Sequence, residues 1–543
     1  MGIPITYQSS EPSISTHLRH YREQLESGRA VRVSDIVNSY TQMQPLMHHK
    51  LATDSVDVDA LNYAATRLPA TIYRVRNVTL ALSREELIAS GIKVDTWSKV
   101  SSPNRRRIMY LDPTGTLLAC LINSDSDIDD VVNNLLAYYI EHRKIGRLLN
   151  HQSEKFLANP DPKALGLEPI ELSGLTSLFR ENWDSFINST SFELNFQITA
   201  VRYDRAKFSQ NCHNWWTDIS ARSLILGFNE VPVYFVSSNS HSLVNIIGGF
   251  INKKQNYIFD YISRTEPDIY ESWFATKREN NREQVNDFLY YLSSRFLSHN
   301  PEFEAEKTDY EKSLGLRTLT DNDRFPTDVQ LIPLSAIANS TNLDPNIKVS
   351  DLDKLRQSKA LIINIQYPLG LAAGYLLDEI LNYFNNLRSV YVIGKAAILN
   401  GKIGDIQIPK SVFDETSGNT YNFENTFNKY FPFESVISTV MLDQKAVCVY
   451  GTFLENNTQM KNYVDIGLNI VEMESGHFLS ALNRKYSQLN NLPIDVGIIN
   501  YASDNPLVEN LTKESLSVRS VESSYLSTLA VLQRIVDLET QAK

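Results

Sequence analysis

The sequence has few cysteines, no long apolar run and no excess of basic residues. Its 543 residues include three cysteines, Cys120, Cys212 and Cys448, a scattered and odd set that argues against a disulfide framework and favours a reducing compartment. No uninterrupted apolar stretch approaches a membrane span. The net charge is −11, from 52 Lys and Arg against 63 Asp and Glu. The sequence has no cluster of basic residues of the kind that binds nucleic-acid phosphates. We therefore expect a cytoplasmic protein that binds neither membranes nor nucleic acid.

Other signatures are missing as well. The N-terminus lacks a basic region followed by an apolar core, so no secretory signal is expected. His48 and His49, like Cys212 and His213, have no further ligands at metal spacing. There is no P-loop, no dinucleotide-binding glycine pattern and no Gly-x-Ser-x-Gly elbow. The sequence therefore predicts no metal and no cofactor.

The length predicts two or more domains. We expect residues 1–165 to form an N-terminal α+β or mostly helical domain of unknown role. Residues 166–355 look like a middle α/β segment, with a polar, irregular insertion or tether at 302–354. The rest of the chain, 356–543, alternates strands with helices and is the best candidate for a catalytic domain.

Local periodicity predicts the main elements. Ahead of residue 300, we expect strands at 108–111, 116–122 and 231–236, and helices at 127–140, 243–247 and 281–299. Beyond residue 359, we expect strands at 360–366, 389–393, 445–450, 466–471 and 496–500, and helices at 371–387, 475–488 and 521–539. Strands this apolar are buried on both faces, which predicts a largely parallel or mixed sheet between layers of helices. The Ser- and Asn-rich loop at 237–242 is equally well read as a ligand loop or an ordinary connection.

Three sequence blocks in the last third carry the chemistry. The first, 390–409, reads as a strand, a glycine turn, and a Gly-Asp pair leading into another strand. Next, Glu472, Met473 and Glu474 end one short apolar strand, and Ser503 and Asp504 end another. One carboxylate can accept hydrogen bonds from a sugar diol, and another can hand over a proton. Such a pair suits cleavage of the bond between a sugar and a base.

In order and spacing, these blocks resemble the nucleoside phosphorylase and nucleosidase superfamily. The resemblance implies a mixed α/β sheet, partly closed into a barrel and flanked by helices, in the C-terminal part. It also implies that Glu474 accepts hydrogen bonds from the ribose hydroxyls while Met473 packs against the sugar. Asp504, next to Ser503, would protonate the purine at N7. A ring such as Phe453 would stack on the base, although a buried core phenylalanine is an equal alternative.

The resemblance assigns further substrate-binding positions. Gly394 marks the turn beside phosphate and ribose, and Gly370 marks a strand-to-helix turn whose N–H groups suit an anion. Lys395 stands where a small hydroxyl residue is usual, and either binds an anion or points into solvent. Val392 replaces the arginine of phosphorolytic members, which favours water as the nucleophile. Glu472 belongs to the same acidic block.

A few neighbouring residues have weaker assignments. We expect Asp405 to fix a turn through backbone hydrogen bonds and Arg519 to orient Asp504. Asp414, Glu415 and Tyr421 are candidates for a pocket wall, but a solvated loop is the favoured interpretation. His477 reads as a packed helix residue, as do most lone histidines of this kind.

Together these features predict hydrolysis or phosphorolysis of the N-glycosidic bond of a purine nucleoside or nucleotide. Inorganic phosphate is then the one co-substrate to consider, and the resemblance implies a homodimer or hexamer. Two alternatives stay open. One is a catalytically inactive nucleotide-sensing domain in a larger regulatory protein, and the other is an interaction scaffold whose function lies in the N-terminal part.

Overall fold

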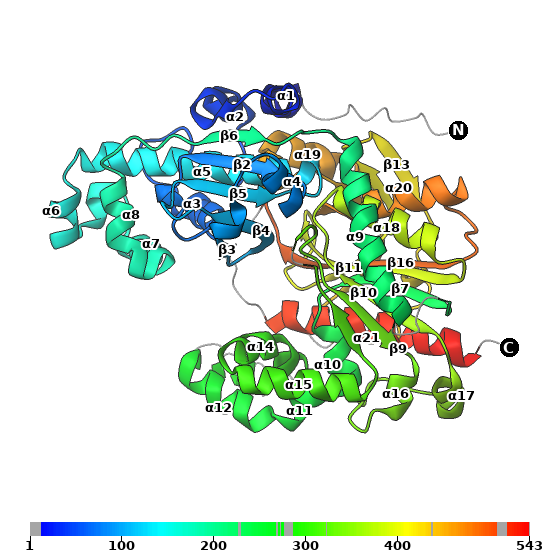
Figure 1. Cartoon of the computed structure of the whole chain (residues 1–543). Helices are drawn as coiled ribbons and strands as arrows, with labels where there is room; N and C mark the ends of the chain where they lie inside the picture. The colour runs from blue at the N-terminus through cyan, green and yellow to red at the C-terminus, as the bar shows by residue number, and fades with distance from the viewer. Residues whose placement is uncertain are drawn as a thin grey trace.

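The computed structural model describes residues 12–225, 230–267, 270–271, 273–275, 286–321, 323–435, 438–507 and 518–541. It contains two sheets that share no strand. The first belongs to an N-terminal unit, and the second runs through the rest of the chain (Figure 1). Within the described part, no helix is both long enough and apolar enough to cross a membrane.

The N-terminal unit is built on a six-stranded sheet in the order β1-β6-β2-β5-β4-β3. Its strands are β1 Val31–Arg32, β2 Asn77–Ala81, β3 Ser98–Ser102, β4 Arg105–Leu111, β5 Leu117–Leu121 and β6 Gln197–Ala200. Its helices are α1 Pro12–Glu26, α2 Val37–Met43, α3 Val58–Ala65, α4 Arg84–Ala89, α5 Asp125–Leu149, α6 Ser153–Ala158, α7 Pro169–Phe179 and α8 Trp183–Ser189. The expected strand pair is confirmed, because β4 and β5 are antiparallel neighbours. The expected helix at 127–140 is also confirmed, inside α5.

This unit continues beyond residue 165, where the sequence suggested a boundary. Strand β6 pairs with β2 in parallel and with β1 in antiparallel fashion, so it is an integral part of the first sheet. Helix α9 (Ala206–Ile225) then leads into the second sheet. The first-sheet unit therefore extends to about residue 200.

The second sheet has ten strands and is mixed, with the path β13-β12-β14-β15-β11-β7-β10-β9-β8 and β16 pairing β11 and β12. Its strands are β7 Val233–Ser238, β8 Arg317–Leu319, β9 Val329–Pro333, β10 Leu361–Gln366, β11 Leu387–Ile398, β12 Ile406–Asp414, β13 Asn419–Asn422, β14 Val440–Cys448, β15 Ile470–Glu472 and β16 Asp495–Asp504. The expected α/β class is confirmed.

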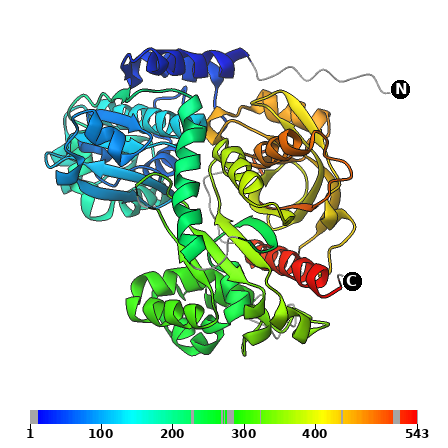
Figure 2. The ribbon, with the colours of Figure 1, turned by 45° about the vertical axis from the view of Figure 1, so that its right-hand side comes forward.

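Five of these strands close into a ring. Strand β11 pairs with β16, β16 with β12, β12 with β14, β14 with β15, and β15 again with β11. The closed ring is visible in yellow and orange in Figure 2. The partly barrel-like sheet expected from the sequence is therefore present, with β7, β10, β9 and β8 extending it as an open wing.

Helices cover both faces of this sheet. They are α10 Ser242–Gly248, α11 Phe250–Lys253, α12 Gln255–Thr265, α14 Asn286–His299, α15 Pro301–Ser313, α16 Ser335–Asn339, α17 Leu352–Gln357, α18 Ala372–Tyr383, α19 Asn457–Asp465, α20 Ser475–Tyr486 and α21 Val518–Gln541. Alternate residues of β7 show why two layers form. Tyr234 and Val236 pack in the core with α10, α14 and α21, whereas Val233 and Phe235 pack in the core with α9, α18 and α20.

Two local expectations need correction, and a third falls partly outside the described residues. The stretch 302–354 is not irregular, because it holds α15, β8, β9, α16 and α17, and β9 pairs with β10. The strand expected at 389–393 continues to Ile398, so Gly394 lies inside β11 and not in a turn. The amphipathic helix expected at 281–299 is confirmed over Asn286–His299, and residues 281–285 lie outside the described part of the chain.

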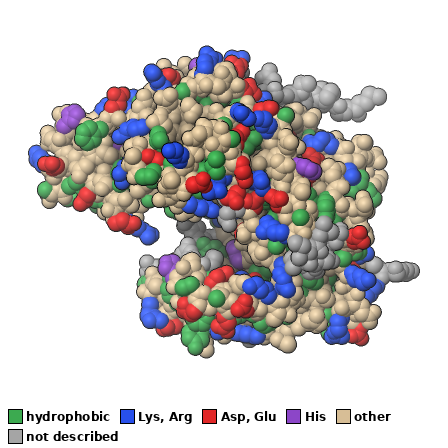
Figure 3. Space-filling view, viewed as in Figure 1, with side chains coloured by type: hydrophobic (Ala, Val, Ile, Leu, Met, Phe, Trp, Pro, Cys, Tyr) green, Lys and Arg blue, Asp and Glu red, His purple; other side chains and the backbone are tan. Residues whose placement is uncertain are grey.

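The surface between the two sheet units is hollowed on the face shown in Figure 3, between the N-terminal unit and the helices α12, α14 and α15. Basic and acidic side chains are interspersed on this face. Close contact between the units occurs elsewhere, where Phe453 and Leu454 of the second unit join the hydrophobic core of the first. That contact positions the site described next.

Candidate functional site

The barrel places the Glu472–Glu474 and Ser503–Asp504 segments at about the same height along its strands. Ala397 on β11 pairs with Val471 of β15 on one side and with Asp504 of β16 on the other. Neighbouring strands lie about 4.8 Å apart, so the Val471 and Asp504 backbones are separated by roughly 10 Å. Glu472 ends β15, and Glu474 follows as the residue before α20. Glu474 and Asp504 thus leave the barrel from strand ends that flank one strand.

Glu474 is tied to the turn that carries Gly370. Its Oε1 accepts a hydrogen bond of 3.1 Å from the Gly370 N–H, at the start of α18. Burial raises the pKa of Glu474 to about 7, and the Gly370 N–H and the nearby Arg105 guanidinium oppose that rise. The carboxylate therefore holds its proton to a higher pH than an ordinary glutamate does.

Glu472 has a different task. Its Oε2 accepts hydrogen bonds of 2.7 Å from the N–H groups of Glu474 and Ser475, which fixes the turn into α20. Burial, with the charge of Glu474, raises the pKa of Glu472 to about 8. In the described residues its Oε1 is buried without a hydrogen-bond partner. Glu472 shapes the turn that presents Met473 and Glu474.

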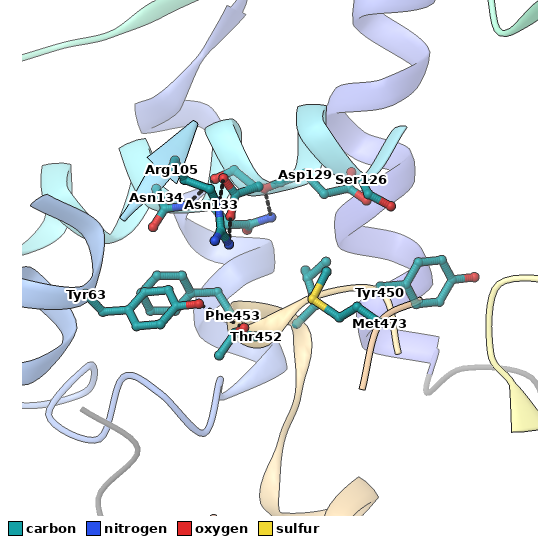
Figure 4. Close-up of a pocket in the computed structure, with 13 residues that line it drawn as sticks. Tyr63, Arg105, Ser126, Asp129, Asn133, Asn134, Tyr450, Thr452, Phe453 and Met473 are labelled. Atoms are coloured by element: carbon teal, nitrogen blue, oxygen red, sulfur yellow. Dashed lines mark hydrogen bonds and ion pairs between the residues drawn. The ribbon is translucent and has the colours of Figure 1, made fainter. Parts of the chain in front are cut away.

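A cavity lies beside this turn, between the two sheet units, and is lined by residues of both (Figure 4). Its barrel side consists of Tyr450, Thr452, Phe453 and Met473, together with Gly451 and Leu454. Phe453 lies in the short helix Thr452–Leu454 and meets the Tyr63 ring edge to face, with 5.1 Å between centroids. Phe453 therefore lines the cavity and packs in a core at the same time, so the two interpretations of this residue are not exclusive.

The N-terminal unit supplies a polar wall opposite these rings. In Figure 4, Arg105, Ser126, Asp129, Asn133 and Asn134 face the barrel residues across the cavity. Arg105 binds Asp130 through two hydrogen bonds, of 2.8 and 3.1 Å. Asn134 is buried, and its Oδ1 has no hydrogen-bond partner in the described residues. The wall is therefore polar and contains a buried acceptor that no described residue satisfies.

Ser126 closes the cavity at the α18 end. Its Oγ accepts a hydrogen bond of 3.1 Å from the Leu371 N–H, one residue beyond Gly370. The two N–H groups that the sequence assigned to an anion are therefore occupied by Glu474 and Ser126. The cavity volume is only about 20 Å³, room for about one water molecule.

Asp504 and its neighbours lie at the end of β16. The Ser503 hydroxyl donates to Asp504 Oδ1 and also lies 3.1 Å from the Ala396 carbonyl oxygen. Asp504 is half-buried and lies within electrostatic range of the buried Glu455, which follows the cavity-lining residue Leu454. Gly394 pairs with Asn500 on the same strand, and the neighbouring Lys395 is exposed.

Two expectations about nearby acids change. Asp414 and Glu415 are buried at the end of β12, so they do not form a solvated loop. Burial raises the pKa of Glu415 to about 7 despite hydrogen bonds from Tyr463 and Gln459. Arg519, which the sequence assigned to orienting Asp504, forms an ion pair of 2.5 Å with Asp405. Asp405 in turn accepts from the Lys402 and Thr439 N–H groups, as its structural assignment predicts.

The sequence-based search missed the N-terminal wall. Arg105, Ser126 and Asn134 lie on β4 and α5, far from the barrel blocks in sequence. One signal was present: α5 begins Asp125-Ser-Asp-Ile-Asp-Asp130, more acids than a single helix start needs. Because acids at a helix N-terminus are also ordinary stabilising residues, this signal alone does not indicate a site.

The fold and these strand ends define a mixed α/β protein with a closed five-stranded barrel and an added N-terminal unit. Within that class, the chain belongs to the family of unknown function DUF6909, which matches residues 33–537. None of the curated proteins matches it.

Solved structures of nucleoside-cleaving enzymes show a limited similarity. Purine nucleoside phosphorylase from Toxoplasma gondii, in complex with immucillin-H, is 11% identical, with 58% of this chain and 93% of that chain covered and a TM-score of 0.32. The 5′-methylthioadenosine/S-adenosylhomocysteine nucleosidase from S. pneumoniae is 12% identical, with coverages of 40% and 90% and a TM-score of 0.30. The corresponding Colwellia psychrerythraea nucleosidase, in complex with adenine, is 15% identical, with coverages of 40% and 86% and a TM-score of 0.29.

The contact between Gly370 and Ser126 gives a prediction about the closed interface. Gly370 has φ +53°, and an added Cβ would lie 2.6 Å from the Ser126 Cβ. We expect Gly370→Ala to lower stability by about 1–3 kcal/mol through this overlap and the left-handed backbone. Ser126→Gly should recover part of the loss, because it removes the overlap and not the backbone cost. Calorimetric melting of both variants and the double variant measures this, and equal losses with and without Ser126 would contradict the packing.

Proposed function

We propose that this protein cleaves the N-glycosidic bond of a purine nucleoside, with water as the attacking group. The observation that carries the proposal is the register of the barrel, which sets Val471 and Asp504 on either side of Ala397. This register supports a site in which Glu474 holds one end of a small ligand and Asp504 holds the other. The resemblance of the three sequence blocks to nucleoside phosphorylases and nucleosidases supports the choice of ligand.

Glu474 would bind the sugar. A carboxylate presents two acceptor oxygens to two adjacent hydroxyl donors, and hydrogen bonds to a charged acceptor are the stronger kind. One Glu474 oxygen is held by the Gly370 N–H, which orients the group before a ligand arrives. Met473, which lines the cavity, would pack against the sugar, and Phe453 would supply a ring to the base.

Asp504 would act as the general acid. Protonation of the purine turns the departing base into a neutral leaving group, and positive charge develops on the sugar as the bond breaks. The Ser503 hydroxyl donates to Asp504 Oδ1 and would leave the other oxygen directed at the base. Glu474 would also stabilise the positively charged sugar, because its carboxylate is the nearest negative group assigned to it.

Two observations favour an uncharged nucleoside over a nucleotide, and water over phosphate. The N–H groups of Gly370 and Leu371, the best anion donors of this turn, already bind Glu474 and Ser126. The carboxylates of Asp129 and Asp130 in the polar wall are paired with Arg22, Arg105 and Arg107, so these guanidinium groups are engaged as well. A doubly charged phosphate entering this cavity would therefore find these amide and guanidinium donors already occupied.

The closed cavity sets a condition on binding. At about 20 Å³ it does not admit a nucleoside, so the N-terminal wall has to move away from the barrel before substrate enters. The same observation favours a second candidate function, a nucleoside-sensing domain. In such a domain, ligand binding would open the closed cavity without cleavage of the ligand. In that case the two carboxylates would bind the ligand without cleaving it.

A substrate panel distinguishes these functions. The purified protein is incubated with adenosine, inosine, methylthioadenosine, AMP and ATP, each with and without phosphate, and free base is measured by liquid chromatography. We expect base release from at least one nucleoside without phosphate, and less from AMP than from adenosine. Binding measured by calorimetry without release would support the sensor. Neither binding nor release would contradict both functions, and release that requires phosphate would contradict water as the nucleophile.

A further inference from the structure

Three residues of different donor type meet beneath the Glu472–Glu474 turn. Asp414 ends β12, Cys448 ends β14, and His477 lies in the first turn of α20. Their ligand atoms all lie within 4.8 Å of one another. The side chains are almost wholly buried, with exposed fractions of 1% for Asp414, 0% for Cys448 and 4% for His477.

The backbone is arranged for this meeting. Asp414 and Cys448 are direct partners in the register of the parallel strands β12 and β14, so their side chains leave the same face. Gly476 allows α20 to approach that face, because an added Cβ would lie 2.9 Å from the Cβ atoms of both Asp414 and Cys448. The glycine thereby brings the next residue, His477, against the pair.

Hydrogen bonding within the cluster is incomplete. The Asp414 carboxylate accepts from the Thr416 N–H and hydroxyl and from the Ser417 hydroxyl, which fixes its position. His477 Nδ1 lies 3.9 Å from Asp414 Oδ2, too far for a hydrogen bond. His477 Nε2 is buried and has no hydrogen-bond partner within the described ranges. A buried imidazole next to a thiol and a carboxylate, with an unsatisfied Nε2, calls for a further binding partner.

We propose that Asp414, Cys448 and His477 bind a zinc ion. Sulfur, imidazole nitrogen and carboxylate oxygen together are the donor set of Zn²⁺, and other common divalent ions favour different sets. In a tetrahedral zinc site, ligand atoms lie about 3.5 Å apart, given the usual bond lengths, so small side-chain adjustments suffice. Binding replaces the thiol proton, which is released to solvent, with a Cys448–zinc bond. One thiolate and one carboxylate then neutralise the charge of the buried ion.

The proposed zinc joins elements that the site depends on. It links the ends of β12 and β14 to the first turn of α20, directly after Glu474. Three protein ligands leave a fourth position for water, which is the ligand number of catalytic zinc sites. Because all three ligands are buried, we expect this ion to stabilise the fold instead. The proposal does not rest on the proposed cleavage of nucleosides and holds equally for a sensing domain.

Metal analysis of the intact protein tests this proposal. The full chain is produced in zinc-supplemented medium without a histidine tag, dialysed, and analysed for zinc by mass spectrometry. We expect one zinc per chain for the wild type and at least a tenfold loss for Cys448→Ser and His477→Ala. Cys120→Ser replaces another buried cysteine, on β5 far from the cluster, and should retain its zinc.

A second measurement keeps the test decisive if the variants do not fold. Wild-type protein produced with Co²⁺ in place of zinc should show the near-ultraviolet charge-transfer band of a cobalt–thiolate bond. A wild type that carries no zinc and shows no such band would overturn the proposal. So would a folded Cys448→Ser variant that keeps its zinc.

Discussion

Replacing Asp504 by asparagine is expected to slow release of free base by about 10²–10⁴-fold, the usual contribution of a general acid. Asparagine keeps the shape and can still accept a hydrogen bond from the Ser503 hydroxyl, as Asp504 does. It has no acidic proton to give to the departing base. The dissociation constant for the nucleoside should therefore change little, and single-turnover kinetics with calorimetric binding separates the two quantities.

A matched exchange controls for the loss of one charge. Asp353 lies on the surface, with its side chain 81% exposed, and Asp353→Asn should leave both rate and affinity unchanged. If the Asp504→Asn variant released base at the wild-type rate, the assignment of the general acid would be wrong. If the affinity for the nucleoside and the rate of base release fell by the same factor, Asp504 would instead be a residue that binds the substrate before cleavage.

Replacing Glu474 by glutamine is expected to lower kcat/KM by about 10²–10⁴-fold, because two hydrogen bonds to a charged group are each worth about 1.5–3 kcal/mol. The variant should also stop distinguishing ribose from dideoxyribose. The wild type would strongly prefer adenosine to 2′,3′-dideoxyadenosine, and Glu474→Gln would act on both at similar, low rates. Retained preference for ribose in the variant would show that another residue reads the hydroxyls.

The pKa of Glu474 gives this prediction a pH dependence. Because burial raises that pKa to about 7, the carboxylate is mostly protonated below neutrality, and wild-type kcat/KM should rise with pH through about 7. The Glu474→Gln variant should lack this rise. A wild-type profile that is flat between pH 5.5 and 8 would contradict the role of an ionised Glu474.

The same shift affects stability with the opposite sign. The folded pKa of Glu474 lies above its ordinary value, so the folded state holds the proton more tightly than the unfolded state. This contribution is complete below the unfolded pKa of about 4.3 and is lost as pH rises through about 7. At pH 8 the free energy of unfolding of Glu474→Gln should therefore exceed that of the wild type by up to about 3 kcal/mol. At pH 4 this difference should vanish.

Much of the barrel could be predicted from the sequence because its strands are short, apolar and separated by polar turns. Strands β10, β14 and β16 lie where the apolar runs indicated, and β16 ends at Asp504 as expected. The Gly-Asp turn at Asp405 also holds, because its hydrogen bonds are local. Strand β9 was missed, since Val329–Pro333 is five residues long and lies in a polar stretch.

The rest depended on contacts between distant segments. Nothing local in α5 indicates that Ser126 binds the Leu371 N–H, and nothing local in β4 indicates that Arg105 lies near Glu474. Likewise, Asp414 looked like part of a solvated loop because its neighbours Thr416 and Ser417 are polar, yet those hydroxyls turn inward to bind it. Its meeting with Cys448 and His477 arises only from strand register and the approach of α20.

A crystal structure of the Asp504→Asn variant soaked with adenosine tests the central claim most directly, because the substrate should remain intact. We expect one nucleoside beside the barrel, with its ribose hydroxyls within 3.2 Å of the Glu474 carboxylate and its base against residue 504. The N-terminal wall should then be displaced from Met473 and Phe453. A nucleoside bound elsewhere, or one that leaves either residue without contact, would contradict the account.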